Sequence, residues 1–302
     1  MNNPIFTGSG TAIITPFTNT GVDYPALARL LDYQLENGTD AVIVCGTTGE
    51  AAAMSREEKN RTIEFTANHV NGRVPVIAGT GSNNTEQAIA NCADAVQSGA
   101  DALLVVTPYY NKATQRGLIQ HYTAVADAAA KPVILYHVPS RTGVKCTAET
   151  YAALARHPNI AGVKEAGGDL ALVQKTRELC PEDFSIWSGN DDETAPIMLF
   201  GGKGVISVAA NVMPRAMHDL THACLDGDFA AAGRMQLALR KLCEALFWEV
   251  NPIPVKTALA IMGFCEERFR LPMCEMEPEN REKLKDVLAQ YGLAQYTERN
   301  AA

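Results

Sequence analysis

Reactive side chains follow several short apolar segments of this sequence. Lys164 directly follows Ile160-Ala161-Gly162-Val163, between small residues. If its side chain points into a core, desolvation disfavours the charged amine and lowers the pKa of Lys164. A neutral amine can attack a carbonyl carbon and form a Schiff base. A lysine at a strand terminus is more often exposed to solvent, so Lys164 alone does not establish this chemistry.

Groups that suit an anionic ligand follow two other apolar segments. Gly46-Thr47-Thr48-Gly49-Glu50 offers hydroxyls and backbone N–H groups just before a predicted helix, where a carboxylate or phosphate can bind. Arg141 offers a planar guanidinium that suits a carboxylate. Each segment alone could also be an ordinary turn, with capping threonines or with an exposed arginine.

Three tyrosines also end or follow apolar segments and could contribute to the same site as Lys164 and Arg141. Tyr136 ends an apolar segment, so its hydroxyl could reach the same rim as Lys164, and Tyr109 and Tyr110 are adjacent after another segment. Adjacent tyrosines at a strand end point in different directions, so one can face a site and the other an interface, although simple aromatic packing would also explain them. A lysine, phenols, an arginine and an anion-binding turn together predict a carbonyl substrate with a carboxylate, a 2-oxo acid.

The elements that must position these groups recur at intervals of roughly 20–35 residues, as βα units do. Eight apolar segments are expected to be strands, and they are continuous rather than alternating, as in strands covered on both faces. These segments are 11–14, 41–44, 74–78, 102–106, 132–136, 160–163, 184–187 and 204–208. Helical spacing lies between them, for example over 24–36 and 85–98, with Asn84 as a predicted N-cap and Ser55 opening a capping box.

This alternation predicts an α/β fold, a (β/α)8 TIM barrel over residues 1–225, followed by a C-terminal helical extension over 226–302. Helices are expected over 229–248, 256–262 and 279–290. An open doubly wound sheet is the alternative, but it usually has a glycine-rich fingerprint after its first strand. Here Gly8-Ser9-Gly10 precedes the first expected strand instead.

Composition narrows the function. The chain has 302 residues, a net charge of −8 and no basic run, which argues against nucleic-acid binding. No apolar stretch is long enough to cross a membrane. The start of the chain lacks the pattern of a secretory signal, and eight widely spaced cysteines without a CxxC pair predict reduced thiols in a cytoplasmic protein.

The histidines give little support for a metal site. His218 and His222 have i, i+4 spacing on a predicted helix, but the sequence shows no third ligand, so no metal is expected. His137, next to Tyr136, should alternate away from the barrel interior and serve in packing.

Five segments together resemble the dihydrodipicolinate synthase / N-acetylneuraminate lyase family, in order along nearly the whole chain. They are 46–50, 76–81, 136–143, 162–166 and 204–208. The resemblance implies a pyruvate-dependent lyase of the class I aldolase type, with Lys164 as the Schiff-base lysine. No metal or organic cofactor is implied, because the lysine itself acts as the electron sink.

The same resemblance implies roles for further residues. Tyr136, Thr47 and Tyr110 match a proton relay, and Thr48 matches a ligand of the pyruvate carboxylate. Gly189 and Ile206 match residues that line the pocket. The tyrosine matching Tyr110 enters the neighbouring subunit's site, which implies at least a dimer and favours a homotetramer built as a dimer of dimers.

Arg141 distinguishes branches of the family. Val138-Pro139-Ser140-Arg141-Thr142-Gly143 matches the synthases, which condense pyruvate with L-aspartate 4-semialdehyde toward diaminopimelate and lysine. A guanidinium suits the carboxylate of the semialdehyde. N-acetylneuraminate lyases and 2-keto-3-deoxy sugar acid aldolases typically lack this arginine and remain the alternative. A non-catalytic relative is a third class, but it would be expected to lack Lys164 or Tyr136.

A possible effector site departs from the family pattern. Asn83 and Tyr109 match relatives inhibited by lysine, whereas Gln87 replaces a glutamate and Lys59 replaces a histidine. Arg56 and Ala51 differ as well. An amide cannot pair with the ammonium of lysine by charge, and Lys59 and Arg56 add positive charge. Feedback by lysine is therefore expected to be weak or absent.

Overall fold

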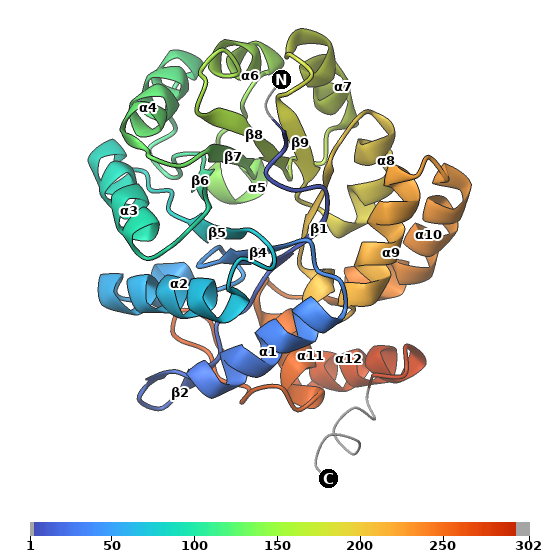
Figure 1. Cartoon of the computed structure of the whole chain (residues 1–302). Coiled ribbons are helices and arrows are strands. Elements are labelled where there is room, and N and C mark those ends of the chain that lie inside the picture. Colours follow the sequence, from blue (N-terminus) through green and yellow to red (C-terminus); the bar gives the residue numbers. More distant parts are fainter. Residues whose placement is uncertain (1–2, 294–302) are drawn as a thin grey trace.

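Eight parallel strands close into a barrel in the computed structural model, which describes residues 3–293 (Figure 1). The order around the barrel is β1-β10-β9-β8-β7-β6-β5-β4, so the expected TIM barrel is confirmed and the open sheet is excluded. The strands are β1 (Gly8–Ala12), β4 (Ala41–Val44), β5 (Val76–Gly79), β6 (Ala102–Val106), β7 (Val133–His137), β8 (Ile160–Glu165), β9 (Ser185–Ser188) and β10 (Gly204–Ser207).

The central strands, such as β6 and β7, are largely apolar on both faces because each face meets a different core, whereas β1 has buried polar residues at Ser9 and Thr11. In β7, Ile134 and Tyr136 belong to the cluster inside the barrel, together with Trp187 and Ile206. Val133 and Leu135 belong to the larger cluster between the strands and the surrounding helices. This is the physical reason for continuous rather than alternating apolar runs.

A ring of helices surrounds the strands (Figure 1). It consists of α1 (Tyr24–Glu36), α2 (Arg56–Val70), α3 (Thr85–Gln97), α4 (Gln115–Ala128), α6 (Ala148–Leu154), α7 (Leu170–Leu179), α8 (Thr194–Leu199) and α9 (Pro214–Leu225). The predicted start signals are confirmed: the Asn84 side chain caps α3, and Ser55 and Glu58 form the capping box of α2. Shorter helical turns lie in the loops as η1 (Ala51–Ala53), α5 (Pro139–Thr142), η2 (Asp191–Glu193) and η3 (Ala209–Asn211).

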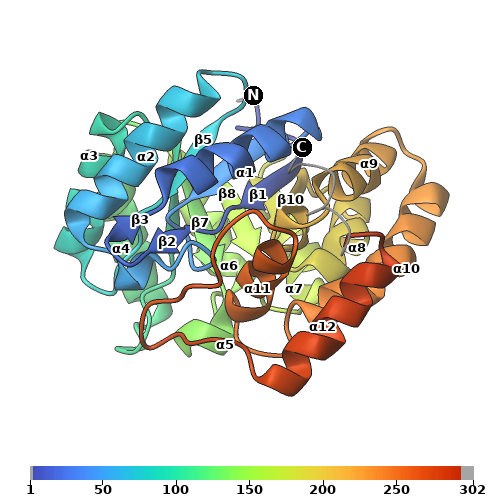
Figure 2. The same ribbon diagram turned by 90° about the horizontal axis from the view of Figure 1, so that it is seen from below.

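Three helices after the barrel confirm the expected helical C-terminal region. They are α10 (Phe229–Ala245), α11 (Ile253–Ile261) and α12 (Pro278–Gln290). Figure 2 shows α11 and α12 side by side, with α10 next to α12. Helix α11 begins at Ile253, earlier than the expected Lys256, and residues 294–302 of the predicted extension lie outside the described residues.

The first strand was placed too late by the sequence pattern. Gly8-Ser9-Gly10 does not precede β1 but forms most of it. A Cβ on Gly10 would lie 2.8 Å from the Phe6 ring, so the strand needs a glycine where that ring fills the end of the barrel. At the other end of β1, the Asn211 side chain accepts from the Ile14 N–H and donates to the Ala12 carbonyl, while the Ile13 N–H still donates to the Ile43 carbonyl of β4.

Two further observations complete the fold. A small hairpin of β2 (Phe17–Thr18) and β3 (Gly21–Val22) was not expected, because strands of two residues leave no periodic signal.

Within residues 3–293, every helix is too short or too polar to cross a lipid bilayer.

Candidate active site

Lys164 points into the barrel near the carboxyl end of β8. Its residue is 5% exposed, and its register partner on β7 is Tyr136. The Lys164 Nζ lies 4.4 Å from the centroid of the Tyr136 ring. Burial lowers the pKa of Lys164 to about 8, with Asp191 opposing the shift and Arg141 adding to it. The side chain of Lys164 therefore meets the condition set by the sequence analysis, since it points inward and is buried.

Gly189, directly after β9, keeps space open beside the amine. A Cβ at this position would lie 3.1 Å from the Lys164 Cε and 2.6 Å from the Ala166 Cβ. Ile206 on β10 is fully buried in the same interior cluster as Tyr136. Gly189 thus borders the Lys164 side chain, and Ile206 lies in the barrel interior.

The turn after β4 is held by its own backbone. The Gly49 N–H donates to the Gly46 carbonyl at 3.2 Å, and the Glu50 N–H donates to the Thr47 carbonyl at 3.0 Å. The N–H groups of Thr47 and Thr48 donate to no carbonyl within this turn. Glu50 adopts a left-handed φ of 53°, which ends the turn sharply. These two N–H groups thus remain unbonded within the turn, and anion binding by them stays a prediction.

A cavity of about 610 Å³ opens at this end of the barrel. Thr47, Tyr136 and Arg141 all line it. Burial raises the pKa of Tyr136, while the Arg141 charge and a hydrogen bond with the Thr47 side chain oppose that shift. The Tyr136 phenol thus stays protonated at neutral pH and can donate a proton toward the region of Lys164.

Asn251, between α10 and α11, joins two of the predicted carboxylate-binding residues. Its side-chain N–H donates to the Thr48 hydroxyl at 3.0 Å, and its carbonyl accepts from Arg141 Nη2 at 3.3 Å. Its Oδ1 is buried and has no hydrogen-bond partner among residues 3–293. Sequence reasoning missed Asn251, because the segment before α11 carries no motif that connects it to the turn near residue 48.

A buried ion pair between Lys256 and Glu50 supports the turn over residues 46–50. Lys256 on α11 is fully buried, and its Nζ donates to Glu50 and to the Arg268 carbonyl. It also lies 4.3 Å from the Phe17 ring centroid. This pair was also missed, although Lys256 is the one charged residue of the largely apolar helix Ile253–Ile261 and is a usable signal, since buried lysines need a partner.

Asp191 is a third residue that the sequence analysis did not select. It lies after β9, and its Oδ2 accepts N–H groups of Val208 and Ala209 at 3.1 and 2.9 Å. Its Oδ1 is buried without a hydrogen-bond partner in the described chain. Burial raises the pKa of Asp191, and the charge of Lys164 opposes that shift. An aspartate just beyond a barrel strand is the signal that could have found it.

The two adjacent tyrosines do face different directions. Tyr109 lines the cavity, whereas Tyr110 is 88% exposed and has a left-handed φ of 73°. A single chain therefore does not bring Tyr110 into a buried site with Lys164.

The residues of the expected effector site lie close to this cavity. Lys59, Gln87 and Tyr109 line it, and the Asn83 carbonyl accepts a hydrogen bond from Asn111. One expectation needs correction. Arg56 is not a free positive charge, because it pairs in a bidentate manner with Asp94 at 2.5 and 2.7 Å.

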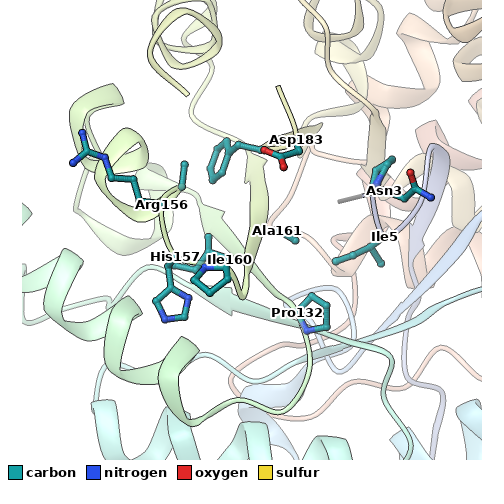
Figure 3. Close-up of a pocket in the computed structure, with 12 residues that line it drawn as sticks. Asn3, Ile5, Pro132, Arg156, His157, Ile160, Ala161 and Asp183 are labelled. Carbon is teal, nitrogen blue, oxygen red and sulfur yellow. The ribbon is translucent and has the colours of Figure 1, made fainter. Parts of the chain in front are cut away.

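A second cavity, of about 560 Å³, lies at the opposite end of the barrel (Figure 3). Pro132, Ile160 and Phe184, at the amino ends of three strands, help to line it. It contains none of the predicted site residues. The predicted site residues that line a cavity, such as Thr47, Tyr136 and Arg141, therefore do so at the carboxyl end of the barrel.

The histidines divide into two cases. His137 points outward as expected, where its Nδ1 lies 2.7 Å from Glu165 Oε1 and its ring packs edge-on against Tyr151. For His218 and His222, the argument that no third ligand exists fails. Asp40, far away in the sequence, joins them in a compact group.

Comparisons with known proteins agree with this geometry. A model of the dihydrodipicolinate synthetase family matches residues 5–291. A 4-hydroxy-tetrahydrodipicolinate synthase from Thermoanaerobacter sp. (strain X514) is 52% identical over 291 residues, which cover 96% of this chain and 98% of the relative.

Solved structures show the same similarity. A dihydrodipicolinate synthase from Aquifex aeolicus superposes with a TM-score of 0.94 at 48% identity, covering 96% of this chain and 99% of that one. The enzyme from Cyanidioschyzon merolae with lysine bound has a TM-score of 0.93 at 38% identity, covering 96% of this chain and all of that one.

The Lys256–Glu50 pair leads to a stability prediction. Lys256→Met should lower the free energy of unfolding by about 3–5 kcal/mol, because Glu50 would remain buried without a counter-charge. The measurement is denaturant unfolding at neutral pH. The matched control is Glu50→Gln with Lys256→Met, which removes both charges and should cost less than Lys256→Met alone. Equal losses would show that the ion pair is not the source of the effect.

Proposed function

The chain belongs to the dihydrodipicolinate synthetase family, and we propose that Lys164 is the Schiff-base lysine of its reaction. The activity is that of a 4-hydroxy-tetrahydrodipicolinate synthase, a lyase of lysine biosynthesis through diaminopimelate. It condenses pyruvate with L-aspartate 4-semialdehyde. The observation that carries the assignment of Lys164 is its burial inside the barrel with a pKa lowered to about 8.

The lysine does the covalent chemistry. The neutral amine of Lys164 attacks C2 of pyruvate, and loss of water yields an imine. Loss of a methyl proton converts the imine to an enamine, whose carbon attacks the aldehyde of the second substrate. The amino group of that substrate then attacks the imine carbon, closes the ring and releases Lys164.

Two groups recognise the two carboxylates. The N–H groups and hydroxyls at Thr47 and Thr48 bind pyruvate, and Arg141 binds the carboxylate of the semialdehyde. The contacts of Asn251 to both Thr48 and Arg141 support this arrangement, because they hold the two subsites at a set separation. Gly189 and Ile206 complete the pocket wall beside the amine.

Protons move through Tyr136, Thr47 and Tyr110. Tyr136 is the general acid and base at the imine, and its ring centroid, 4.4 Å from the Lys164 Nζ, supports this role. Tyr110 acts in the site of a neighbouring subunit. Its 88% exposure in the single chain supports this role. The working unit is therefore at least a dimer, and a dimer of dimers is the proposed assembly.

The chain works as one catalytic unit with a barrel over 1–225 and an extension over 226–302. Asn251 and Lys256 support this view, because the extension directly contacts the anion-binding turn. The proposed location is the cytoplasm. All eight cysteines are free thiols, and burial raises the pKa of most of them, that of Cys45 to about 12, which keeps them protonated.

Feedback by lysine is proposed to be weak. Gln87 presents an amide where a carboxylate would pair with an ammonium, and its side chain already bonds to Asn91 at 2.8 Å. Lys59 places a positive charge in the same cavity. The Arg56 charge contributes less than its sequence position indicates, since Asp94 neutralises it.

The activity is tested by ring-product formation from pyruvate and L-aspartate 4-semialdehyde. The wild-type chain should form the product, should show no comparable turnover of N-acetylneuraminate or 2-keto-3-deoxygluconate, and should keep its rate with added lysine.

Arg141→Ala should raise KM for the semialdehyde far more than KM for pyruvate. Lys164→Ala should lose both turnover and borohydride trapping of pyruvate, and continued trapping would contradict the role of Lys164.

The rate of imine formation should rise with pH around a midpoint near 8. The neutral fraction of the Lys164 amine grows as pH rises through its pKa, so trapping slows about tenfold per unit below it. Asp191→Asn should move the midpoint to lower pH, because the carboxylate favours the charged amine. Asp192→Asn is the matched control on the exposed neighbouring residue. An unchanged midpoint in Asp191→Asn would remove Asp191 from this role.

Sharing of Tyr110 between subunits is testable by complementation. Tyr110→Phe and Lys164→Ala chains should each be nearly inactive alone. Refolded together, they should recover up to about a quarter of wild-type activity, because each mixed dimer has one site with both groups intact. Mixing Tyr110→Phe with chains that carry both substitutions should give no recovery. If the first mixture also stays inactive, Tyr110 does not act across subunits.

A further inference from the structure

Asp40, His218 and His222 converge at the end of the barrel opposite Lys164. Asp40 directly precedes β4, at the amino end of that strand, and the two histidines lie one turn apart on α9. His218 Nδ1 lies 3.3 Å from Asp40 Oδ2, and His222 Nε2 lies 3.2 and 3.3 Å from the two carboxylate oxygens. Among residues 3–293, these three form the one group of histidine, cysteine or acidic side chains whose ligand atoms are close enough together to hold a metal ion.

The separations between each imidazole nitrogen and the Asp40 carboxylate match those of neighbouring ligands around one tetrahedral ion, and all three ligand atoms lie within 4.8 Å of one another. Metal–ligand bonds of about 2.0–2.1 Å at tetrahedral angles place neighbouring ligand atoms about 3.3 Å apart. The same separations are long for hydrogen bonds to a carboxylate, which are commonly about 2.7–2.9 Å. Two imidazoles and one carboxylate are also a donor set that suits zinc and related first-row ions.

The surroundings hold the carboxylate and leave access from solvent. The Ser9 N–H donates to Asp40 Oδ2 at 2.8 Å, which fixes the orientation of a ligand as outer groups do in metal sites. The Asp40 and His218 side chains are each 21% exposed, and His222 is 41% exposed. A Cβ on Gly8 would lie 2.2 Å from Asp40 Oδ2 and 3.2 Å from His222 Nε2, so only glycine leaves this space open.

Other histidine–aspartate contacts in the chain differ from this group. His69 with Asp32 and His157 with Asp127 are simple pairs, at 2.7 and 3.0 Å. Each has one imidazole and a distance typical of a hydrogen bond. The three-residue group therefore differs from the usual surface pair in both composition and spacing.

We propose that Asp40, His218 and His222 bind one divalent transition-metal ion of the zinc class, with water as the fourth ligand. The ion would join the start of β4 and the adjacent β1 to α9. Its place at the amino end of the barrel, away from Lys164, makes its role structural.

The test uses the full-length chain after dialysis against a chelator. Zn²⁺ should bind at one ion per chain in equilibrium dialysis, and Co²⁺ should give the visible absorption of a four-coordinate ion without a thiolate charge-transfer band. The absence of that band separates this site from cysteine binding. Saturating Zn²⁺ should raise Tm by roughly 3–6 °C.

Variants decide the assignment. His222→Gln and His218→Gln should each weaken Zn²⁺ binding roughly 100-fold or more and remove the Co²⁺ band, while circular dichroism shows a folded chain. His157→Gln, which breaks an ordinary pair, should bind both ions as the wild type does. Absence of Zn²⁺ binding by the wild type, or equal binding by His222→Gln, would overturn the proposal and leave the group as hydrogen-bonded side chains only.

Discussion

The exclusion of water from the Lys164 amine is the constraint on which the site depends. A lysine surrounded by solvent stays charged at neutral pH and is a poor nucleophile. The closed barrel places this lysine beside Tyr136 and behind Gly189, and burial lowers its pKa to about 8. The nearby carboxylate of Asp191 limits the shift, so that the amine remains able to exchange protons near neutral pH.

The C-terminal helices are part of this site rather than a separate layer. Lys256 reaches Glu50 at the end of the anion-binding turn, and Asn251 reaches Thr48 within it. The turn has internal hydrogen bonds of its own, from the Gly49 and Glu50 N–H groups. Buried contacts from the extension add to the rigidity that these bonds supply.

The two ends of the barrel have different tasks. Polar groups at the carboxyl end, such as Tyr136 and Arg141, border a cavity of about 610 Å³. At the amino end, Phe6 stacks on Trp187 and fills the interior, and Asp40 joins β1 to α9. Such a division lets chemistry and stability depend on different residues.

The sequence by itself determined the barrel, because strands covered on both faces are mostly apolar and their spacing has few other solutions, although the polar residues of β1 hid where that strand begins. It also determined the positions of Lys164, Tyr136, Thr47 and Arg141 at strand ends. Only the tertiary structure decided how Asn251, Lys256 and Asp191 join that site, and that Asp40 meets His218 and His222. These contacts join residues that are tens to hundreds of positions apart in the sequence. They form only when the barrel closes, so no local periodicity or motif can predict them.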